Sequence, residues 1–350
     1  MAHSPLSRRD FLKLGVSALG SLAFTSFLPD IGEFNDSVMV RVAAKSVSVY
    51  SQPDDTSLIV SQHYRDEIVN VYNEVITKAP GYNPIWYRVW GGYMHRARLQ
   101  KVRKAYNIPL TAISEKGQLA EVTVPYTATM QYTTYHGWQP LYRLYYTTTH
   151  WIVGIDEGPD KRPWYRLWDE LMKINYYVEA THLRVISEEE WAPISPEIPF
   201  NKKLIKVDLT RQNLTAYEND RIVFEKKVST GIPGLRSKNE IPTETPRGNF
   251  NIEDKYPSKH MGEGNLASDI EAYELVGVPW TSFFSEKGYA FHGTYWHDNF
   301  GVPMSHGCVN MRPEEARWLF RWSRPVVTPG DFKVPYKIDY RDFGTSVEIS

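Results

Sequence analysis

The stretch GYAFHGTYWHDNFGVPMSHGCVNM, residues 288–311, contains the only cysteine in this chain of 350 residues. Cys308 lies two positions after His306 and 16 positions after His292. A thiol attacks a carbonyl carbon as its thiolate, so a nucleophilic cysteine, whose free pKa is about 8.5, needs a base or a cation beside it. Histidine is the usual base. The stretch therefore admits two interpretations of Cys308: a nucleophile with its base, or a packed residue without chemistry.

The residues on either side of Cys308 predict a strand, a loop and a helix. GYAFHGT, residues 288–294, has the pattern of a buried strand, and the segment from residue 313 begins Pro-Glu-Glu, as helices often do. The 15 residues between His292 and Cys308 form a loop that can bring the two side chains together. His306 can also approach the thiol, because alternate residues of an extended segment share a face.

Two further possibilities concern the groups around the thiol. Gly307 lets the backbone approach a substrate closely, and the amides of Gly307 and Cys308 are candidates for an oxyanion hole. Histidine and aspartate are also ordinary metal ligands, although their spacing here fits no common zinc signature. The alternative metal site would use His292, His297, Asp298 and His306.

The overall composition excludes few functions but is informative about partners. The net charge is −1, so nothing in the sequence points to nucleic acid or to a basic membrane-binding surface. Hydrophobic residues make up 42% of the chain and charged residues 23%, as in ordinary globular proteins. The 23 tyrosines and 11 tryptophans suit β-rich domains, and also clefts that bind carbohydrate or peptide.

Residues 1–36 have the pattern of an export signal. Arg8 and Arg9 precede an uncharged, mostly apolar stretch from residue 14 to residue 28. This stretch is shorter than a membrane-spanning helix, which needs about 20 residues. SRRDFLK, residues 7–13, resembles the twin-arginine signal of bacteria, which implies export to the cell envelope by the twin-arginine translocase. No clean A-x-A cleavage site follows, so both removal of the segment and its retention as an anchor stay open.

Two segments of similar sequence follow the signal, at residues 37–105 and 118–187. Both contain short strand-like runs, and WYRVW at 86–90 returns as WYRLW at 164–168. A period of about 78 residues indicates two copies of one small domain rather than a solenoid. Both copies resemble bacterial SH3-like barrels, which bind cell-wall peptides or position a catalytic domain. Strand-rich spacers without a binding function remain the alternative.

The remainder of the chain is predicted to be a linker and a catalytic domain. Residues 188–201 are rich in proline and poor in aliphatic residues, which is typical of a linker. Residues 202–340 are predicted to form the catalytic domain, mostly of strands. Within it, Asn219 and Asp220 mark a hairpin turn between LTAY and IVFEKKV.

The chemistry-bearing residues also resemble a known family. A histidine, a spacer and the motif S/T-H-G-C-hydrophobic-N/R form the signature of the L,D-transpeptidase (YkuD) family, matched here by His292, Ser305, His306, Gly307, Cys308, Val309 and Asn310. The family's upstream S-T-G and T-P-x-G segments are matched by Ser229, Thr230, Gly231, Thr245, Pro246 and Gly248. The resemblance covers about residues 202–327. It implies a mainly β fold: a YkuD-like β-sandwich with a helix after the cysteine, preceded here by two small SH3-like β-barrels.

The resemblance also implies a role for each residue that matches the motif. Cys308 would be the nucleophile, and His292 the general base that later protonates the leaving amine. The backbone carbonyl of Gly293 would orient the imidazole, and His306 would support the thiolate. The amides of Gly307 and Cys308 would hold the oxyanion. Residues that would contact the substrate are Ser305, Asn310 and three aromatic residues that are equally well explained as core residues, Trp280, Tyr295 and Trp296.

The implied reaction is acyl transfer on peptidoglycan, without a metal or another cofactor. The cysteine attacks a donor tetrapeptide stem after its third residue, D-Ala leaves, and an acceptor stem resolves the thioester to give a 3→3 cross-link. Carbapenems would acylate the same thiol. Hydrolysis of the thioester, which is L,D-carboxypeptidase activity, uses the same residues and stays open. So do the attachment of a protein or a D-amino acid to the wall, and a wall-binding protein without catalysis.

Overall fold

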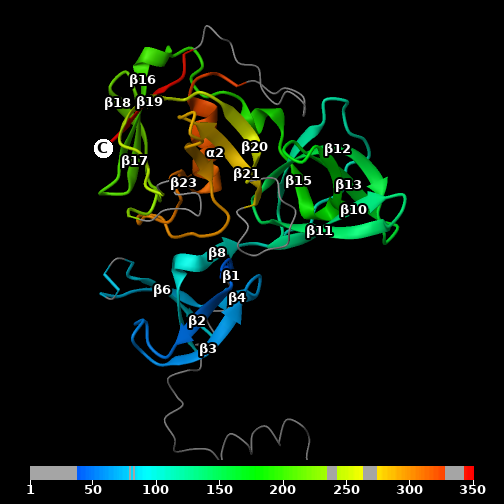
Figure 1. The fold of residues 1–350 in the computed structure, drawn as a ribbon, viewed down its shortest axis with the longest axis horizontal. Helices are drawn as coiled ribbons and strands as arrows, with labels where there is room; N and C mark the ends of the chain where they lie inside the picture. The colour runs from blue at the N-terminus through cyan, green and yellow to red at the C-terminus, as the bar shows by residue number, and fades with distance from the viewer. Residues whose placement is uncertain (1–37, 79, 82, 235–242, 263–273, 328–342) are drawn as a thin grey trace, which may run out of the picture. The chain divides into compact units, whose positions relative to one another are not determined.

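The structure is a computed structural model that describes residues 38–78, 80–81, 83–234, 243–262, 274–327 and 343–350 (Figure 1). The predicted export signal, residues 1–36, lies outside the described residues. Among the residues described, no helix is long and apolar enough to span a membrane. The described chain is mainly β, with α2 (Pro313–Trp322) following the cysteine, so the predicted fold class is confirmed.

The described residues bury hydrophobic side chains in three clusters, each centred on one predicted globular segment, although residues of the second module such as Trp151 join the cluster of the C-terminal domain. The first cluster belongs to residues 38–102, which form a three-stranded sheet in the order β4-β1-β8 and a five-stranded sheet in the order β3-β2-β7-β6-β5. The strands are β1 (Val38–Val42), β2 (Ser46–Tyr50), β3 (Ile59–Tyr64), β4 (Ile68–Val71), β5 (Asn73–Ile76), β6 (Ile85–Val89), β7 (Gly92–His95) and β8 (Leu99–Val102). We call residues 38–102 the first module.

The second module, residues 118–185, forms one seven-stranded sheet in the order β11-β10-β14-β13-β12-β9-β15. The strands are β9 (Gln118–Val122), β10 (Tyr126–Thr133), β11 (Gly137–Tyr145), β12 (Thr149–Glu157), β13 (Pro163–Asp169), β14 (Ile174–Glu179) and β15 (Leu183–Val185). Its core contains buried residues from β9, β12, β13 and β14.

The two modules share one pattern of strand pairing, as two copies of one small domain would. In the first module β1 pairs with β4 and β8, and β2 pairs with β3 and β7. In the second, β9 pairs with β12 and β15, and β10 pairs with β11 and β14. A short 3-10 helix precedes the last strand in both modules, η2 (Arg96–Arg98) and η3 (Ala180–His182). Their likeness to SH3-like barrels stays a prediction.

The C-terminal domain contains two sheets that share one core. One sheet has the order β18-β17-β16-β24-β19 and the other the order β20-β21-β22-β23. The elements are β16 (Lys203–Asp208), β17 (Asn213–Glu218), β18 (Arg221–Lys227), β19 (Gly248–Asn251), β20 (Lys255–Met261), β21 (Leu275–Phe283), β22 (Ala290–Gly293), β23 (Val309–Met311), α2 and β24 (Ser346–Ile349). Ile205 of the first sheet and Phe291 of the second belong to the same hydrophobic cluster, and α2 packs on β21 and β22 (Figure 1).

The boundary predicted at residue 340 is too early, because β24 belongs to this domain. β24 runs parallel to β16 and antiparallel to β19, so it is an interior strand of the first sheet. The prediction missed it because the four residues of β24 are separated from β16 by most of the domain. A strand this short has no sequence pattern that sets it apart from a tail.

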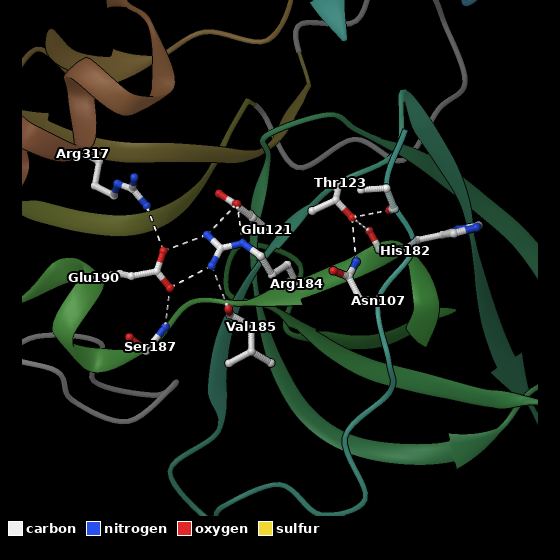
Figure 2. Close-up of polar contacts among 10 residues, drawn as sticks. Asn107, Glu121, Thr123, His182, Arg184, Val185, Ser187, Glu190 and Arg317 are labelled. Carbon is white, nitrogen blue, oxygen red and sulfur yellow. Dashed lines mark hydrogen bonds and ion pairs between the residues drawn. The ribbon is translucent and has the colours of Figure 1, made fainter. Parts of the chain in front are cut away.

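The predicted linker is also wrong, since residues 188–201 are packed rather than free. They include η4 (Glu188–Trp191), and Trp191 is buried in the core of the C-terminal domain. The carboxylate of Glu190 accepts hydrogen bonds from Arg184 of β15 at 2.8 Å and from Arg317 of α2 at 3.3 Å (Figure 2). Arg184 also donates to Glu121 of β9. Glu190 in this segment therefore joins the second module to α2.

Two buried lysines complete the C-terminal end of α2. The last carbonyls of a helix lack partners within it and carry a partial negative charge. Nζ of Lys203 donates to the carbonyl of Trp322 at 2.7 Å, and Nζ of Lys255 donates to that of Ser323 at 2.7 Å. Both lysines are at most 2% exposed. The two cations thus hold the helix that follows the cysteine motif against strands of both sheets.

A histidine between two carboxylates connects the second module to β20. Nδ1 of His260 lies 2.7 Å from Oδ2 of Asp169, and Nε2 lies 2.8 Å from Oε2 of Glu274. Burial acts to lower the pKa of His260, but the hydrogen bonds and charges of these two carboxylates outweigh it and raise the pKa above its ordinary value. The protonated imidazole is therefore favoured between them.

We expect His260→Gln to lower the free energy of unfolding by about 3 kcal/mol at pH 6, since it leaves two buried carboxylates without their cation. Because folding raises the pKa of His260, its contribution is complete below about pH 6.5 and is lost as the pH rises through the folded value. Urea unfolding should show a smaller difference between variant and wild type at pH 9. His136→Gln, at an exposed histidine of the second module, is the control. An equal loss at both pH values would contradict a charged His260.

Candidate active site

The second sheet of the C-terminal domain brings the histidine and the cysteine to neighbouring positions. His292 lies on β22, and Cys308 directly precedes β23, which pairs with β22 in parallel. In this register His292 lies opposite Asn310. Sγ of Cys308 lies 3.8 Å from the carbonyl oxygen of Gly288, two residues before β22 begins. The predicted loop thus returns the thiol to the strand that carries the imidazole.

The imidazole of His292 is held in one protonation state. Its Nδ1 lies 3.1 Å from the carbonyl oxygen of Gly293, which only accepts hydrogen bonds, so Nδ1 carries a proton. His292 is 1% exposed, and burial lowers its pKa to about 4. The ring is therefore neutral at pH 7, and Nε2 is left unprotonated. This is the state that a general base requires, and the Gly293 carbonyl makes the contact that the resemblance implies.

The thiol of Cys308 is half-buried and neutral at rest. Burial raises its pKa to about 11, although the backbone amide of Ala290 acts in the opposite direction. In the described part of the chain no hydrogen bond joins this thiol to His292. With these pKa values, roughly one thiol in 10⁴ is ionised at pH 7. At rest the two groups are therefore a neutral imidazole and a neutral thiol rather than a thiolate–imidazolium pair.

We expect the alkylation of Cys308 by iodoacetamide to rise about tenfold for each pH unit between pH 7 and pH 10, because only the thiolate reacts. The pKa of about 11 predicts that no plateau is reached within this range. Mass spectrometry of the labelled chain measures the rate directly, since Cys308 is its only cysteine. A plateau that begins near pH 7 would contradict the neutral pair and indicate a preformed thiolate–imidazolium pair.

The S-T-G segment upstream supports the loop that carries the cysteine. The amide of Ser229 donates to the carbonyl of Asn310 at 3.0 Å, and the Asn310 amide donates to the Ser229 carbonyl at 2.8 Å. The hydroxyl of Thr245 donates to the carbonyl of Gly307 and accepts from the amide of Gly231, both at 2.8 Å. A Cβ on Gly231 would lie 2.0 Å from a backbone oxygen, so only glycine fits. The motif residues thus act as a structural frame.

The amide of Gly307 is not directed toward a substrate, contrary to the sequence prediction. It donates to the hydroxyl of Ser305 at 3.2 Å, and this hydroxyl donates to the carbonyl of Cys308. Gly307 has a φ of 117°, and a Cβ there would lie 2.3 Å from the ring of Tyr289. Gly307 and the buried Ser305 therefore shape the turn. The amide of Cys308 is the remaining candidate for an oxyanion donor.

The three predicted cleft aromatics fall in different environments. Trp280 is 2% exposed and packs on Phe320 in the core, with ring centroids 5.4 Å apart, so it is not a cleft residue. Tyr295 is buried and stacks on Tyr145 of the second module at 5.6 Å. Trp296 is half-buried, and its ring lies 5.6 Å from that of His292. Only Trp296 remains a candidate for a wall beside the site.

His306 and the alternative metal site differ from what the motif suggests. The side chain of His306 is exposed, while that of His292 is buried, so only His292 has the environment that keeps an imidazole neutral. Both ring nitrogens of His297 have partners, the amide of Asn299 at Nδ1 and the carboxamide of Asn310 at Nε2. Across the residues that the structure describes, no three histidine, cysteine or acidic side chains are grouped as metal ligands.

The sequence reasoning missed the contact between the first module and the loop that follows His292. Asp298 accepts a hydrogen bond from the amide of Lys101, and its own amide donates to the carbonyl of Leu99 at 3.0 Å. Arg41 donates to the carbonyl of Tyr295 at 2.8 Å. No local pattern could have revealed these contacts, since some 200 residues separate their partners.

A family model agrees with the motif. The model of the YkuD family, the L,D-transpeptidase catalytic domain, matches residues 202–349. A search of curated proteins found no match. An L,D-transpeptidase from Mycobacterium smegmatis is 23% identical, with a TM-score of 0.32, over 43% of this chain and 58% of that one. The L,D-transpeptidase of Xylanimonas cellulosilytica is 25% identical, with a TM-score of 0.29, over 42% and 60%.

L,D-transpeptidase 1 of Mycobacterium tuberculosis is 19% identical, with a TM-score of 0.28, over 43% of this chain and 61% of that one. The match thus spans about three fifths of the length of these three structures. Identification rests on the family match and on the residues that the motif places around Cys308. Residues 202–349 of this chain match the model of the YkuD family, the L,D-transpeptidase catalytic domain.

Proposed function

We propose that the chain is an exported L,D-transpeptidase that forms 3→3 cross-links between peptidoglycan stem peptides. The observation that carries the proposal is the neutral His292, with Nδ1 fixed by Gly293 and Nε2 unprotonated, in the domain that holds the lone thiol. The same residues match the motif of a family whose members act on such stems. No metal or cofactor takes part in the proposed reaction.

In the first half-reaction Sγ of Cys308 attacks the carbonyl carbon of the third residue of a donor tetrapeptide. The thiol proton passes to Nε2 of His292, and the amide of Cys308 donates to the oxyanion. The bond to D-Ala then breaks, and the imidazolium returns its proton to the leaving amine. The products are a thioester on Cys308 and free D-Ala.

In the second half-reaction the side-chain amine of an acceptor stem attacks the thioester. His292 takes a proton from this amine, and the sulfur leaves and is protonated again, which restores the resting neutral pair. The 3→3 amide bond is formed without net consumption of any other reactant.

The test is to incubate the chain with disaccharide-tetrapeptides and to identify the products by mass spectrometry. The proposal predicts a dimer that lacks one D-Ala. Tripeptide without dimer would replace it with L,D-carboxypeptidase activity. Unchanged substrate, together with no carbapenem adduct on Cys308, would leave a wall-binding protein. Export through the twin-arginine translocase to the cell envelope belongs to the same proposal, and a fusion of residues 1–37 to a reporter that matures only when exported folded would test it.

A further inference from the structure

The first module holds the loop between His292 and Cys308 through hydrogen bonds to the buried Asn299. Oδ1 of Asn299 accepts a hydrogen bond from Nε of Arg96 at 3.1 Å and another from Nδ2 of Asn83. Nη2 of Arg96 also donates to the carbonyl of Phe300 at 3.4 Å. Asn299 and Asn83 are 1% and 2% exposed, so the amides are removed from water. Buried amides paired in this way fix the backbone that carries them.

Asn299 in turn fixes the ring of His297. The amide of Asn299 donates to Nδ1 of His297 at 3.1 Å, and its carbonyl accepts from the hydroxyl of Ser229 at 2.8 Å. Burial is the main reason that the pKa of His297 falls to about 3, so the ring is neutral. A neutral imidazole has one donor and one acceptor nitrogen. Since Nδ1 accepts, Nε2 of His297 carries the proton and donates.

The donor on His297 determines how the carboxamide of Asn310 is turned. One polar atom of this carboxamide lies 3.0 Å from Nε2 of His297. Which atom of a carboxamide is oxygen and which is nitrogen is assigned from their hydrogen-bond partners. Because Nε2 of His297 donates, the atom of Asn310 beside it must be the carboxamide oxygen. The amide nitrogen then occupies the other position, which has no hydrogen-bond partner among the described residues. Asn310 is fully buried and lies opposite His292 in the sheet.

A buried donor without a partner is unfavourable by about 1–3 kcal/mol, so its retention calls for a function. Paired residues of adjacent strands project to the same face. The free N–H group of Asn310 is therefore held on the face of His292, at the strand that begins directly after Cys308. A carbonyl oxygen of a bound stem peptide is the acceptor that the proposed reaction brings to this face.

We propose that the first module positions a substrate-binding group of the active site. Arg96 and Asn83 hold Asn299, Asn299 sets the tautomer of His297, and His297 turns the Asn310 carboxamide so that its N–H group binds a carbonyl oxygen of the stem peptide. His297, Asn299 and Arg96 are positioning residues that act through Asn310. The identity of this ligand rests on the proposed function, whereas the positioning does not.

The test compares variants of the whole chain. Arg96→Ala and His297→Leu should each lower kcat/KM for D-Ala release by about 10- to 100-fold, since small displacements of a binding group have effects of this size. His297→Gln, whose amide can still donate to Asn310, should recover part of the loss. Arg88→Ala, on β6 of the same module, is the matched control, because no described contact joins Arg88 to residues 295–300. Thermal unfolding and the alkylation rate of Cys308 should be unchanged in Arg96→Ala.

The decisive comparison is made in an Asn310→Ala background. If the positioning residues act through Asn310, then Arg96→Ala and His297→Leu have no further effect there. Independent, additive losses would overturn the proposal, as would a kcat/KM for Arg96→Ala equal to that of Arg88→Ala.

A spectroscopic readout separates this proposal from the proposed function. In the wild-type chain the ¹⁵N spectrum of His297 should show a protonated Nε2 and an unprotonated Nδ1. Arg96→Ala should move both signals toward the average of the two tautomers, and Arg88→Ala should not. If the wild-type chain acts on no stem peptide, the proposed function fails, and these spectra alone decide the positioning. Unchanged His297 signals in Arg96→Ala would overturn it.

Discussion

The Cys308→Ala variant should release no D-Ala and form no cross-linked dimer, a loss of at least about 10⁴-fold, because no other group in the site can form the acyl-enzyme. The chain has no second thiol to substitute for it. The assay is the mass-spectrometric product analysis with tetrapeptide stems, and it should also show that the variant gains no carbapenem adduct.

Folding is the control for this variant. Cys308 is half-buried, and its removal deletes one sulfur atom, so the midpoint of thermal unfolding should change by only a few degrees. Cys308→Ser should be nearly as inactive, since a serine hydroxyl is far less acidic than a thiol and the neutral His292 has no carboxylate to assist it. Dimer formation by Cys308→Ala at the wild-type rate would remove Cys308 from the reaction altogether.

The His292→Ala variant should have the second largest effect, a loss of about 10²–10⁴-fold in kcat/KM, which is the usual contribution of a general base. Its residual activity should rise with pH toward the thiol pKa of about 11, because hydroxide then forms the thiolate that His292 no longer generates. In the wild type, kcat/KM should fall below a pH of about 4, where His292 becomes protonated and can no longer accept a proton.

His306→Ala is the matched control, since His306 lies two positions from Cys308 but is exposed. We expect it to retain most of the activity and the wild-type acid limb. Equal losses in the two histidine variants would mean that His306 shares the work of the base, as the family resemblance implies for the thiolate. A wild-type acid limb in His292→Ala would assign the titration to another group.

The parts of the fold that the sequence predicted correctly depend on residues close together in the chain. The hairpin turn at Asn219 and Asp220 needs positive φ at both positions, and the structure has 48° and 65° there. The helix after the cysteine begins at Pro313, where the proline and the acids that follow it predicted its start. The repeat was visible because corresponding strands in both modules keep the same core residues, among them Trp86 and Trp164.

The candidate site was predictable to the extent that it is a linear motif. His292 and Cys308 reach neighbouring positions because β22 and β23 pair, and the motif contains both strands. What the sequence did not reveal depends on distant partners. The Gly307 amide is occupied because it donates to the hydroxyl of Ser305. Trp280 is buried because it packs on α2. Residues 188–201 are docked because Glu190 takes part in a network of charged groups across three elements. From composition alone, residues 188–201 are predicted to be an unpacked linker.

The placement of β24 has a consequence for the biosynthesis of the protein. β24 separates β16 from β19 in the first sheet of the C-terminal domain, and it pairs in parallel with β16. A ribosome must therefore translate the entire stretch from residue 203 to residue 349 before the hydrogen bonds of β16 can be completed. Until then the nascent chain presents two unpaired strand edges, which are open to chaperones and to aggregation. Completion of this sheet therefore waits for the synthesis of β24, and a chain without β24 would leave β16 and β19 without the strand that joins them.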